Sequence, residues 1–300
     1  MTAASSVPAL RLATRGSRQA LAQSTTVASA ITAATGRAVD LVLIETTGDI
    51  RQDVPLHSIG GQGVFVKEVQ RAVLDGRADI AVHSAKDLPS DIADGLVIGA
   101  FTERRRANDV LVGSTLDNLE PGATVASGSV RRRAQLAAVR PDLAFVELRG
   151  NIDTRLSKIP HRGAIVMALA ALDILELTER IDQTLGLEAF VPAVGQGCVA
   201  VECRIDDHET RASISAVDHG DTRRRVEIER AFLGELGSGC SLPVGGHVIA
   251  DDLHVFLADP DRGVSVGVVV PVPGSSHGVA TPQMLDVARS AAQLAQERLG

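Results

Sequence analysis

The sequence predicts an α/β fold with more than one domain. Three short apolar runs have the length of strands: 10–14, 39–44 and 79–83. Between them, one helix is expected from the capping residue Ser17 to Gly36 and another over about 64–74. Strands that are apolar at nearly every position are typical of a mostly parallel sheet with helices on both faces. The length of 300 residues suggests two or three domains.

A charged cluster at Glu103–Arg106 interrupts this pattern, and further strands and helices follow it. Strands are expected at 124–127, 144–148 and 164–168, with helices at 129–139 and about 152–158. After an apolar strand at 199–203, the expected elements are a helix at 222–236, strands at 244–249, 253–257 and 264–270, and a helix at 284–299. The cluster therefore marks a domain crossing.

Composition argues against several classes of protein. The net charge of −7 provides no basic field for nucleic acid or an anionic membrane, and the absence of Trp and Tyr leaves no platform for stacking bases. The N-terminus lacks the basic start and apolar core of a signal peptide. The longest apolar run, 164–172, is well short of the roughly 20 residues of a membrane span. We expect a cytoplasmic protein with no nucleic-acid or membrane partner.

The three cysteines are too few for a disulfide framework. No paired C-x-x-C units or histidine cluster accompany them, so no metal site is expected. Cys198 and Cys203 lie in an apolar strand and are expected to be inert. Cys240 lies in a glycine-rich loop, where an accessible thiol would be a strong nucleophile. A small buried hydrophobic residue is the alternative for this position.

The strand at 79–83 runs into the sequence His83-Ser84-Ala85-Lys86-Asp87-Leu88-Pro89. Ligands of open α/β sheets bind beyond the carboxyl ends of the strands, so Lys86 and Asp87 are well placed to meet one. A solvated turn is the alternative, since Asp and Pro are also ordinary turn residues. His83 is expected to pack within the strand and is not a candidate base.

Several arginines stand at the ends of expected elements, where they would line a ligand cleft. They are Arg15, Arg104, Arg131, Arg132, Arg149 and Arg155. Ser129 opens the helix of Arg131 and Arg132, so free backbone N–H groups and guanidinium groups would converge on one anion. The set suits a ligand with many carboxylates. Arg105, Arg106 and Arg133 are assigned instead to a solvated face.

Six sequence blocks together resemble the porphobilinogen deaminase family, also called hydroxymethylbilane synthases. They are ATRGS at 13–17, HSAKDLP at 83–89, ASGSVRRRAQL at 126–136, LRGNIDTRL at 148–156, PAVGQGCVAVECR at 192–204 and GSGCSLPVG at 237–245. The blocks stand in the family's order and spacing and run over most of the chain. Several spaced motifs in order are far more specific than any single one.

The resemblance implies a transferase of tetrapyrrole (haem) biosynthesis that joins four porphobilinogen molecules head to tail with loss of ammonia. Hydrolysis then frees hydroxymethylbilane. Cys240 would carry a dipyrromethane cofactor as a thioether, and Asp87 would be catalytic. Cofactor-binding residues would be Lys86, Ser129, Arg131, Arg132 and Arg155. Substrate-binding residues would be Arg15, Ser17 and Arg149.

The resemblance also implies a monomer with three domains. Two are α/β domains of periplasmic-binding-protein type around a cleft, 1–103 with 198–218 and 104–197; a small α/β domain at 219–300 presents Cys240. In this arrangement the strand at 199–203 returns to the first sheet.

One departure from the family pattern bears on activity, since Ile174 stands where the family has a carboxylate-binding Arg. Two alternatives remain open: a divergent, impaired or re-purposed paralogue, and a non-enzymatic protein that binds small anions.

Overall fold

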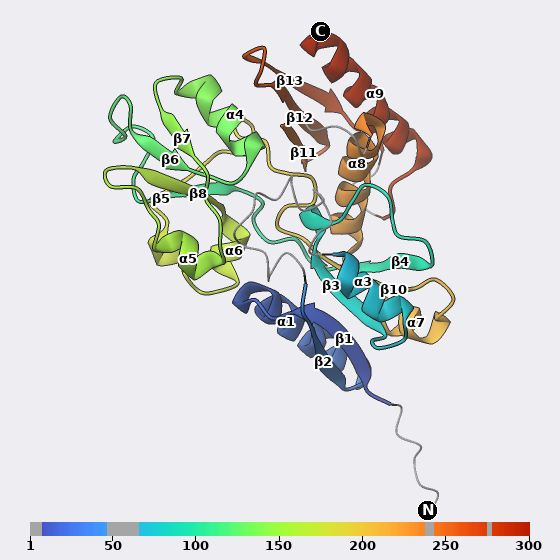
Figure 1. The fold of residues 1–300 in the computed structure, drawn as a ribbon. Helices are drawn as coiled ribbons and strands as arrows, with labels where there is room; N and C mark the ends of the chain where they lie inside the picture. Colours follow the sequence, from blue (N-terminus) through green and yellow to red (C-terminus); the bar gives the residue numbers. More distant parts are fainter. Residues whose placement is uncertain (1–7, 47–65, 238–242, 275–277) are drawn as a thin grey trace, which may run out of the picture. The chain divides into compact units, whose positions relative to one another are not determined.

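The computed structural model describes residues 8–46, 66–237, 243–274 and 278–300 (Figure 1). The chain forms two compact units, each made of two segments. Unit 1 comprises Met1–Glu103 and Val199–His219, and unit 2 comprises Arg104–Cys198 and Gly220–Gly300. Helices and sheets occur in both units, which confirms the predicted α/β class. The division into three domains stays a prediction.

Unit 1 contains a five-stranded sheet in the order β2-β1-β3-β10-β4. The strands are β1 (Leu10–Arg15), β2 (Val39–Ile44), β3 (Ile80–Ser84), β4 (Leu96–Phe101) and β10 (Val199–Arg204). The helices are α1 (Arg18–Thr35), α3 (Lys67–Leu74) and α7 (His208–Ser215). β1 is parallel to β2 and β3, whereas β10 is antiparallel to β3 and β4. The late strand therefore joins the first sheet, as the resemblance implied.

Helices cover both faces of this sheet. Successive residues of a strand point to opposite faces, so a single strand can contribute to two cores. On β3, Ile80 and Val82 pack in a core with Val27 of α1. Ala81 packs in a second core with Val69 of α3. Burial on both faces explains why β3 is apolar up to His83.

Unit 2 contains a five-stranded sheet in the order β7-β6-β8-β5-β9. Its strands are β5 (Asp109–Val112), β6 (Thr124–Ala126), β7 (Ala144–Val146), β8 (Ala164–Ala168) and β9 (Gln183–Thr184). Its helices are α4 (Val130–Val139), α5 (Ile152–Leu156) and α6 (Leu169–Asp173). β6 is parallel to β7 and β8, and β5 is antiparallel to β8 and β9.

A second sheet of unit 2 is antiparallel, in the order β11-β12-β13. Its strands are β11 (Val244–Ile249), β12 (Asp252–Asp259) and β13 (Val264–Pro271), and the accompanying helices are α8 (Gly220–Leu236) and α9 (Pro282–Leu299). Phe232 of α8, Val255 of β12 and Ala288 of α9 belong to the same buried core. Helices α8 and α9 therefore share one core with this sheet.

The sequence located most of these elements to within two residues. For α1 the expected cap is confirmed: the Ser17 side chain accepts a hydrogen bond from Ala20 N at 3.3 Å, and Gly36 ends the helix at φ 72°. β4, β5, β9, α6 and α7 were not predicted. β5 and α6 are short, and α7 is mostly polar, so none of the three produces a strong periodic pattern.

Candidate active site

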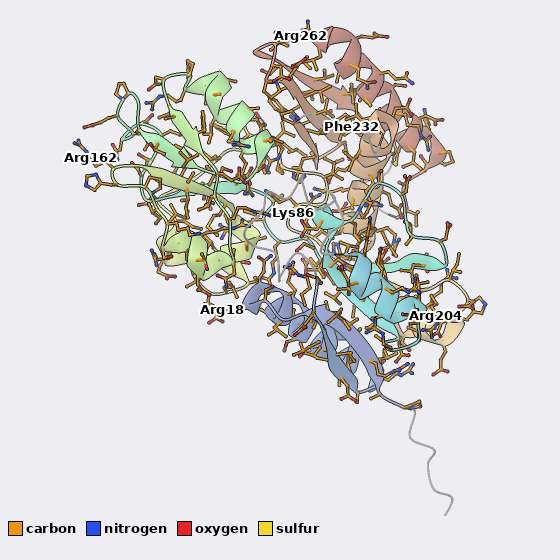
Figure 2. The ribbon with its side chains drawn as sticks, in the orientation of Figure 1. Arg18, Lys86, Arg162, Arg204, Phe232 and Arg262 are labelled. Atoms are coloured by element: carbon orange, nitrogen blue, oxygen red, sulfur yellow. The ribbon has the colours of Figure 1, made fainter. Side chains whose placement is uncertain are left out.

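The Lys86–Asp87 pair lies in unit 1, on a 3₁₀ turn (Ala85–Asp87) directly after β3 (Figure 2 labels Lys86). β3 is a central strand, and its residues from Ile80 to His83 are buried. Asp87 is exposed and Lys86 half-buried. The turn thus presents one carboxylate to solvent from the carboxyl end of a rigid strand, where ligands of such sheets bind.

Arg15 and Ser17 lie at the same edge of the sheet. β1 and β3 are parallel, with Leu12 opposite Ile80, so the carboxyl ends of both strands meet at one edge. Arg15 is the last residue of β1, and Ser17 caps α1 immediately after it. Within unit 1, the structure therefore gathers the predicted substrate-binding residues Arg15 and Ser17 with the Lys86–Asp87 pair.

Ser129, Arg131 and Arg132 lie at the N-terminus of α4 in unit 2. The Ser129 side chain caps α4 by accepting a hydrogen bond from Arg132 N at 3.4 Å. Both arginine side chains are buried against Asp109, the first residue of β5. Arg131 Nη1 lies 2.8 Å from Asp109 Oδ2, and Arg132 Nη2 lies 2.8 Å from Oδ1. Gln196 Nε2 also donates to Oδ1, at 2.8 Å.

This cluster carries a surplus positive charge. Burial would raise the pKa of Asp109, but Arg131 and Arg132 hold it well below its usual value. Burial lowers the pKa of Arg131, Asp109 opposes that shift, and the like charge of Arg132 adds to it. One carboxylate is therefore shared by two buried guanidinium groups, beside the positive end of a helix. An additional anion would balance the charge.

Arg149 precedes a tight turn that leads into α5, and Arg155 lies within that helix. Gly150 has φ 118°, a conformation that disfavours any side chain, and its carbonyl accepts a hydrogen bond from Arg155 Nε at 2.8 Å. Arg149 Nη1 is buried and has no hydrogen-bond partner among the described residues. A Cβ at Gly128 would lie 2.7 Å from Leu148 O, so the loop before α4 touches this turn. The predicted anion-binding residues of unit 2 are thus close neighbours.

Cys240 lies outside the described residues, and its role stays a prediction. The other two cysteines are buried, as predicted. Burial, with a contribution from Asp207, raises the pKa of Cys203 to about 11, which leaves almost no thiolate at neutral pH. In the described part of the chain, no cluster of three or more His, Cys, Asp or Glu side chains is arranged to hold a metal.

Arg104 differs from the expectation that it lines a ligand cleft. Its Nη1 lies 2.6 Å from Glu229 Oε1 of α8, and its Nε donates to Gln196 O at 2.8 Å. The Arg104 side chain is 9% exposed and Glu229 is fully buried. The Arg104 guanidinium is therefore paired with a residue far along the chain, and no local sequence pattern predicts such a partner.

The buried acids Asp109 and Glu202 were not predicted from the sequence. Asp109 opens the apolar strand Asp-Val-Leu-Val, and Glu202 lies in the apolar strand of β10. Because charged residues are almost never fully buried without a partner, a lone acid inside an apolar strand is the signal that could have found them. The identity of the partner, however, depends on the fold.

Comparison with known proteins assigns the family. Residues 10–212 match the family model described as "Porphobilinogen deaminase, dipyromethane cofactor binding domain". A porphobilinogen deaminase of Nitratidesulfovibrio vulgaris (strain Miyazaki F) is 46% identical over 246 residues, covering 80% of this chain and 78% of the relative. The chain belongs to the porphobilinogen deaminase family. A second relative with that name, from strain DP4, is 46% identical over 256 residues, covering 82% of this chain and 81% of its own.

Solved structures similar to this member of the porphobilinogen deaminase family include the methionine-binding protein MetQ, with a TM-score of 0.45 and 14% identity over 69% of this chain and 89% of its own. A periplasmic substrate-binding protein from Coxiella burnetii has a TM-score of 0.43 and 15% identity, over 69% of this chain and 91% of its own. At these scores the fold class rests on the sheets of the chain itself.

The residues around α4 fit the cofactor named by the family model. A dipyrromethane carries several carboxylates, and this region offers a surplus buried positive charge, a capped helix N-terminus and an Arg149 Nη1 without a hydrogen-bond partner among the described residues. These features match the charge of the ligand.

Proposed function

We propose that this chain is a hydroxymethylbilane synthase, a transferase that condenses four porphobilinogen molecules head to tail and releases ammonia at each step. The observation that carries the proposal is the 46% identity to proteins named porphobilinogen deaminase over four fifths of the chain. The product, hydroxymethylbilane, would leave by hydrolysis and serve tetrapyrrole (haem) biosynthesis.

Cys240 would hold the cofactor through its sulfur. When bound, the dipyrromethane supplies the pyrrole primer on which the product is built. Ser129, Arg131, Arg132 and Arg155, together with Lys86, would bind its carboxylates. Arg131 and Arg132 would do so through the charge that Asp109 leaves unbalanced, so the cofactor would complete an ion cluster that is already ordered.

Asp87 would be the catalytic group. Porphobilinogen becomes a cation when ammonia leaves, and a carboxylate near the pyrrole nitrogen stabilises that charge and accepts or returns the N–H proton. The exposed Asp87 carboxylate at the end of β3 suits this role. Arg15, Ser17 and Arg149 would bind the carboxylates of the incoming substrate. Each porphobilinogen carries two carboxylates, which a guanidinium group binds well.

The remaining features of the proposal concern the setting of the enzyme. No helix in the described ranges is long and apolar enough to cross a membrane. We place the protein in the cytoplasm as a monomer of three domains that uses neither nucleic acid nor membrane as a partner. The proposed third domain corresponds to the sheet β11-β12-β13 with α8 and α9.

A stalled paralogue is a second candidate, because Ile174 replaces an arginine of the family pattern. Ile174 is the residue that ends α6, and the neighbouring Asp173 pairs with Arg105 at 2.6 Å. Under this alternative the protein loads its cofactor but elongates slowly, and Ile174→Arg raises turnover. A non-enzymatic anion-binding protein is the third candidate, and it would leave Cys240 unmodified.

Intact-protein mass before and after incubation with porphobilinogen tests the proposal, with Cys240→Ser as the control. The expected result is a dipyrromethane-sized adduct that requires Cys240, followed by increments of one pyrrole. An adduct without increments would support the stalled paralogue. No adduct at all would refute the synthase and favour the binding protein.

A further inference from the structure

Three buried polar side chains meet on one face of the sheet of unit 1. Glu202 of β10 is 1% exposed, and Gln70 of α3 and His83 of β3 are each 6% exposed. Gln70 Nε2 donates to Glu202 Oε2 at 2.9 Å and to Oε1 at 3.2 Å. His83 Nε2 lies 3.1 Å from Glu202 Oε2, within ion-pair distance, but it makes no hydrogen bond to any described residue. The cluster thus ties α3 and β3 to the antiparallel strand between β3 and β4.

The carboxylate of Glu202 is buried with weak compensation. In the described part of the chain no lysine or arginine pairs with it, and its partners are one amide and one imidazole. Burying a carboxylate is costly, and apolar side chains of similar volume often stabilise a core at least as well. A contribution to stability therefore does not explain why this carboxylate is buried. A requirement to hold β3 in a fixed position does explain it.

The cluster holds β3 immediately before the 3₁₀ turn of Lys86 and Asp87. His83 is the penultimate residue of β3 and points to the α3 face. The next residue, Ser84, points to the opposite face, where its Oγ accepts a hydrogen bond from Gln23 Nε2 of α1 at 3.1 Å. The end of β3 is therefore held on both faces by polar contacts.

We propose that Glu202, acting through His83, is a positioning residue for the Lys86–Asp87 turn. This inference rests on the proposed function, since it takes Asp87 to be the catalytic group. A displacement of about 1 Å at a reacting group can cost roughly a hundredfold in rate, so catalytic side chains depend on buried contacts that fix the elements bearing them. In this proposal the Glu202–His83 contact fixes the end of β3, from which the turn of Asp87 begins.

His83→Leu tests the proposal in the full-length protein. We expect kcat to fall about tenfold or more while KM stays within about twofold, because the substrate-binding arginines are untouched. Intact mass should show a normal dipyrromethane-loaded fraction and slower one-pyrrole increments. His83→Gln should recover part of kcat, because its amide can donate a hydrogen bond to Glu202.

The chain supplies a matched control in His247 of unit 2. His247 is 5% exposed, and its Nδ1 lies 3.1 Å from Glu229 Oε1 in a second buried His–Glu pair. His247→Leu removes an imidazole–carboxylate contact of the same length from the other unit, where the contact is a hydrogen bond. We expect it to lower the thermal midpoint, followed by circular dichroism, and to leave kcat within about twofold of the wild type.

Two results would overturn the proposal: wild-type kcat in folded His83→Leu, or an equal loss of kcat in His247→Leu. If His83→Leu does not fold, Glu202→Gln decides, and a folded Glu202→Gln with unchanged kcat and elongation rate refutes the role. The wild-type protein distinguishes failure of the positioning role from failure of the proposed function. A wild type without adduct refutes the synthase, whereas a wild type with normal increments leaves only the positioning role at stake.

Discussion

The two five-stranded sheets share one plan but neutralise a buried acid in different ways. Each places an antiparallel strand beside its third parallel strand, β10 in unit 1 and β5 in unit 2. Each of these strands carries a buried carboxylate, Glu202 on β10 and Asp109 on β5. Asp109 meets two arginines and a glutamine, whereas Glu202 meets a histidine and a glutamine.

The difference separates two uses of a buried acid. Asp109 is the counter-ion of two guanidinium groups, so its loss would leave two charges buried with no carboxylate between them. Among the described residues Glu202 contacts an amide and an imidazole and no arginine or lysine, so its loss would leave only an amide and a ring nitrogen to satisfy. We expect Asp109 to matter most for stability and Glu202 most for geometry.

Asp109→Asn should have the largest effect on stability. Removing one partner of a buried ion pair typically costs about 3–5 kcal/mol, and here two arginines lose their counter-ion. Urea unfolding followed by circular dichroism measures the loss, since the chain has no Trp or Tyr for fluorescence. Asp142→Asn is the control, because Asp142 pairs with Arg140 on the surface and should cost less than about 1 kcal/mol. Equal losses in the two variants would contradict the comparison.

Glu229→Gln should have the second-largest effect on the free energy of unfolding, and that effect should depend on pH. Burial raises the pKa of Glu229, but the Arg104 guanidinium and the His247 ring hold it at about 2, below the ordinary 4.5. A lowered pKa means that ionisation stabilises the fold above pH 4.5 and that this contribution disappears as the pH falls toward 2. The contribution at neutral pH is about 3 kcal/mol.

The measurement is the unfolding free energy of wild type and Glu229→Gln at several pH values. The gap between them should be widest near neutral pH and should narrow as the pH falls from 4.5 to 2. Glu227→Gln is a suitable control, since Glu227 makes a half-exposed contact with Arg223 at 3.2 Å. A gap independent of pH would show that the Glu229 charge does not supply the stabilisation.

Sequence reasoning was strongest where one strand or helix determines its own pattern. The strand at 39–44 and the cap at Ser17 follow from apolar runs and from capping chemistry, both of which are local. The positions of Lys86 and Asp87 also follow from the sequence, because an apolar strand followed by polar residues and a proline places those polar residues at a sheet edge.

Sequence reasoning was weaker where the partner of a charged group lies far along the chain. Arg104 was expected in a cleft but pairs with Glu229, 125 residues away. Arg131 and Arg132 of α4 both pair with Asp109 of β5, a strand that was itself not predicted. Local patterns give the residue types available for pairing, whereas the strand order decides which of them meet.

Glu202→Gln should have the smallest effect on stability and so offers the sharpest test of the comparison. The variant keeps the volume of the side chain and an oxygen that can accept from Gln70, so we expect a loss of about 1 kcal/mol in urea unfolding. The substitution exchanges the carboxylate facing His83 for an amide. We therefore expect kcat to fall clearly, even though the free energy of unfolding changes little. A loss of stability as large as that of Asp109→Asn would show that both acids serve the core in the same way. Unchanged stability and unchanged kcat together would show that the Glu202 charge serves neither.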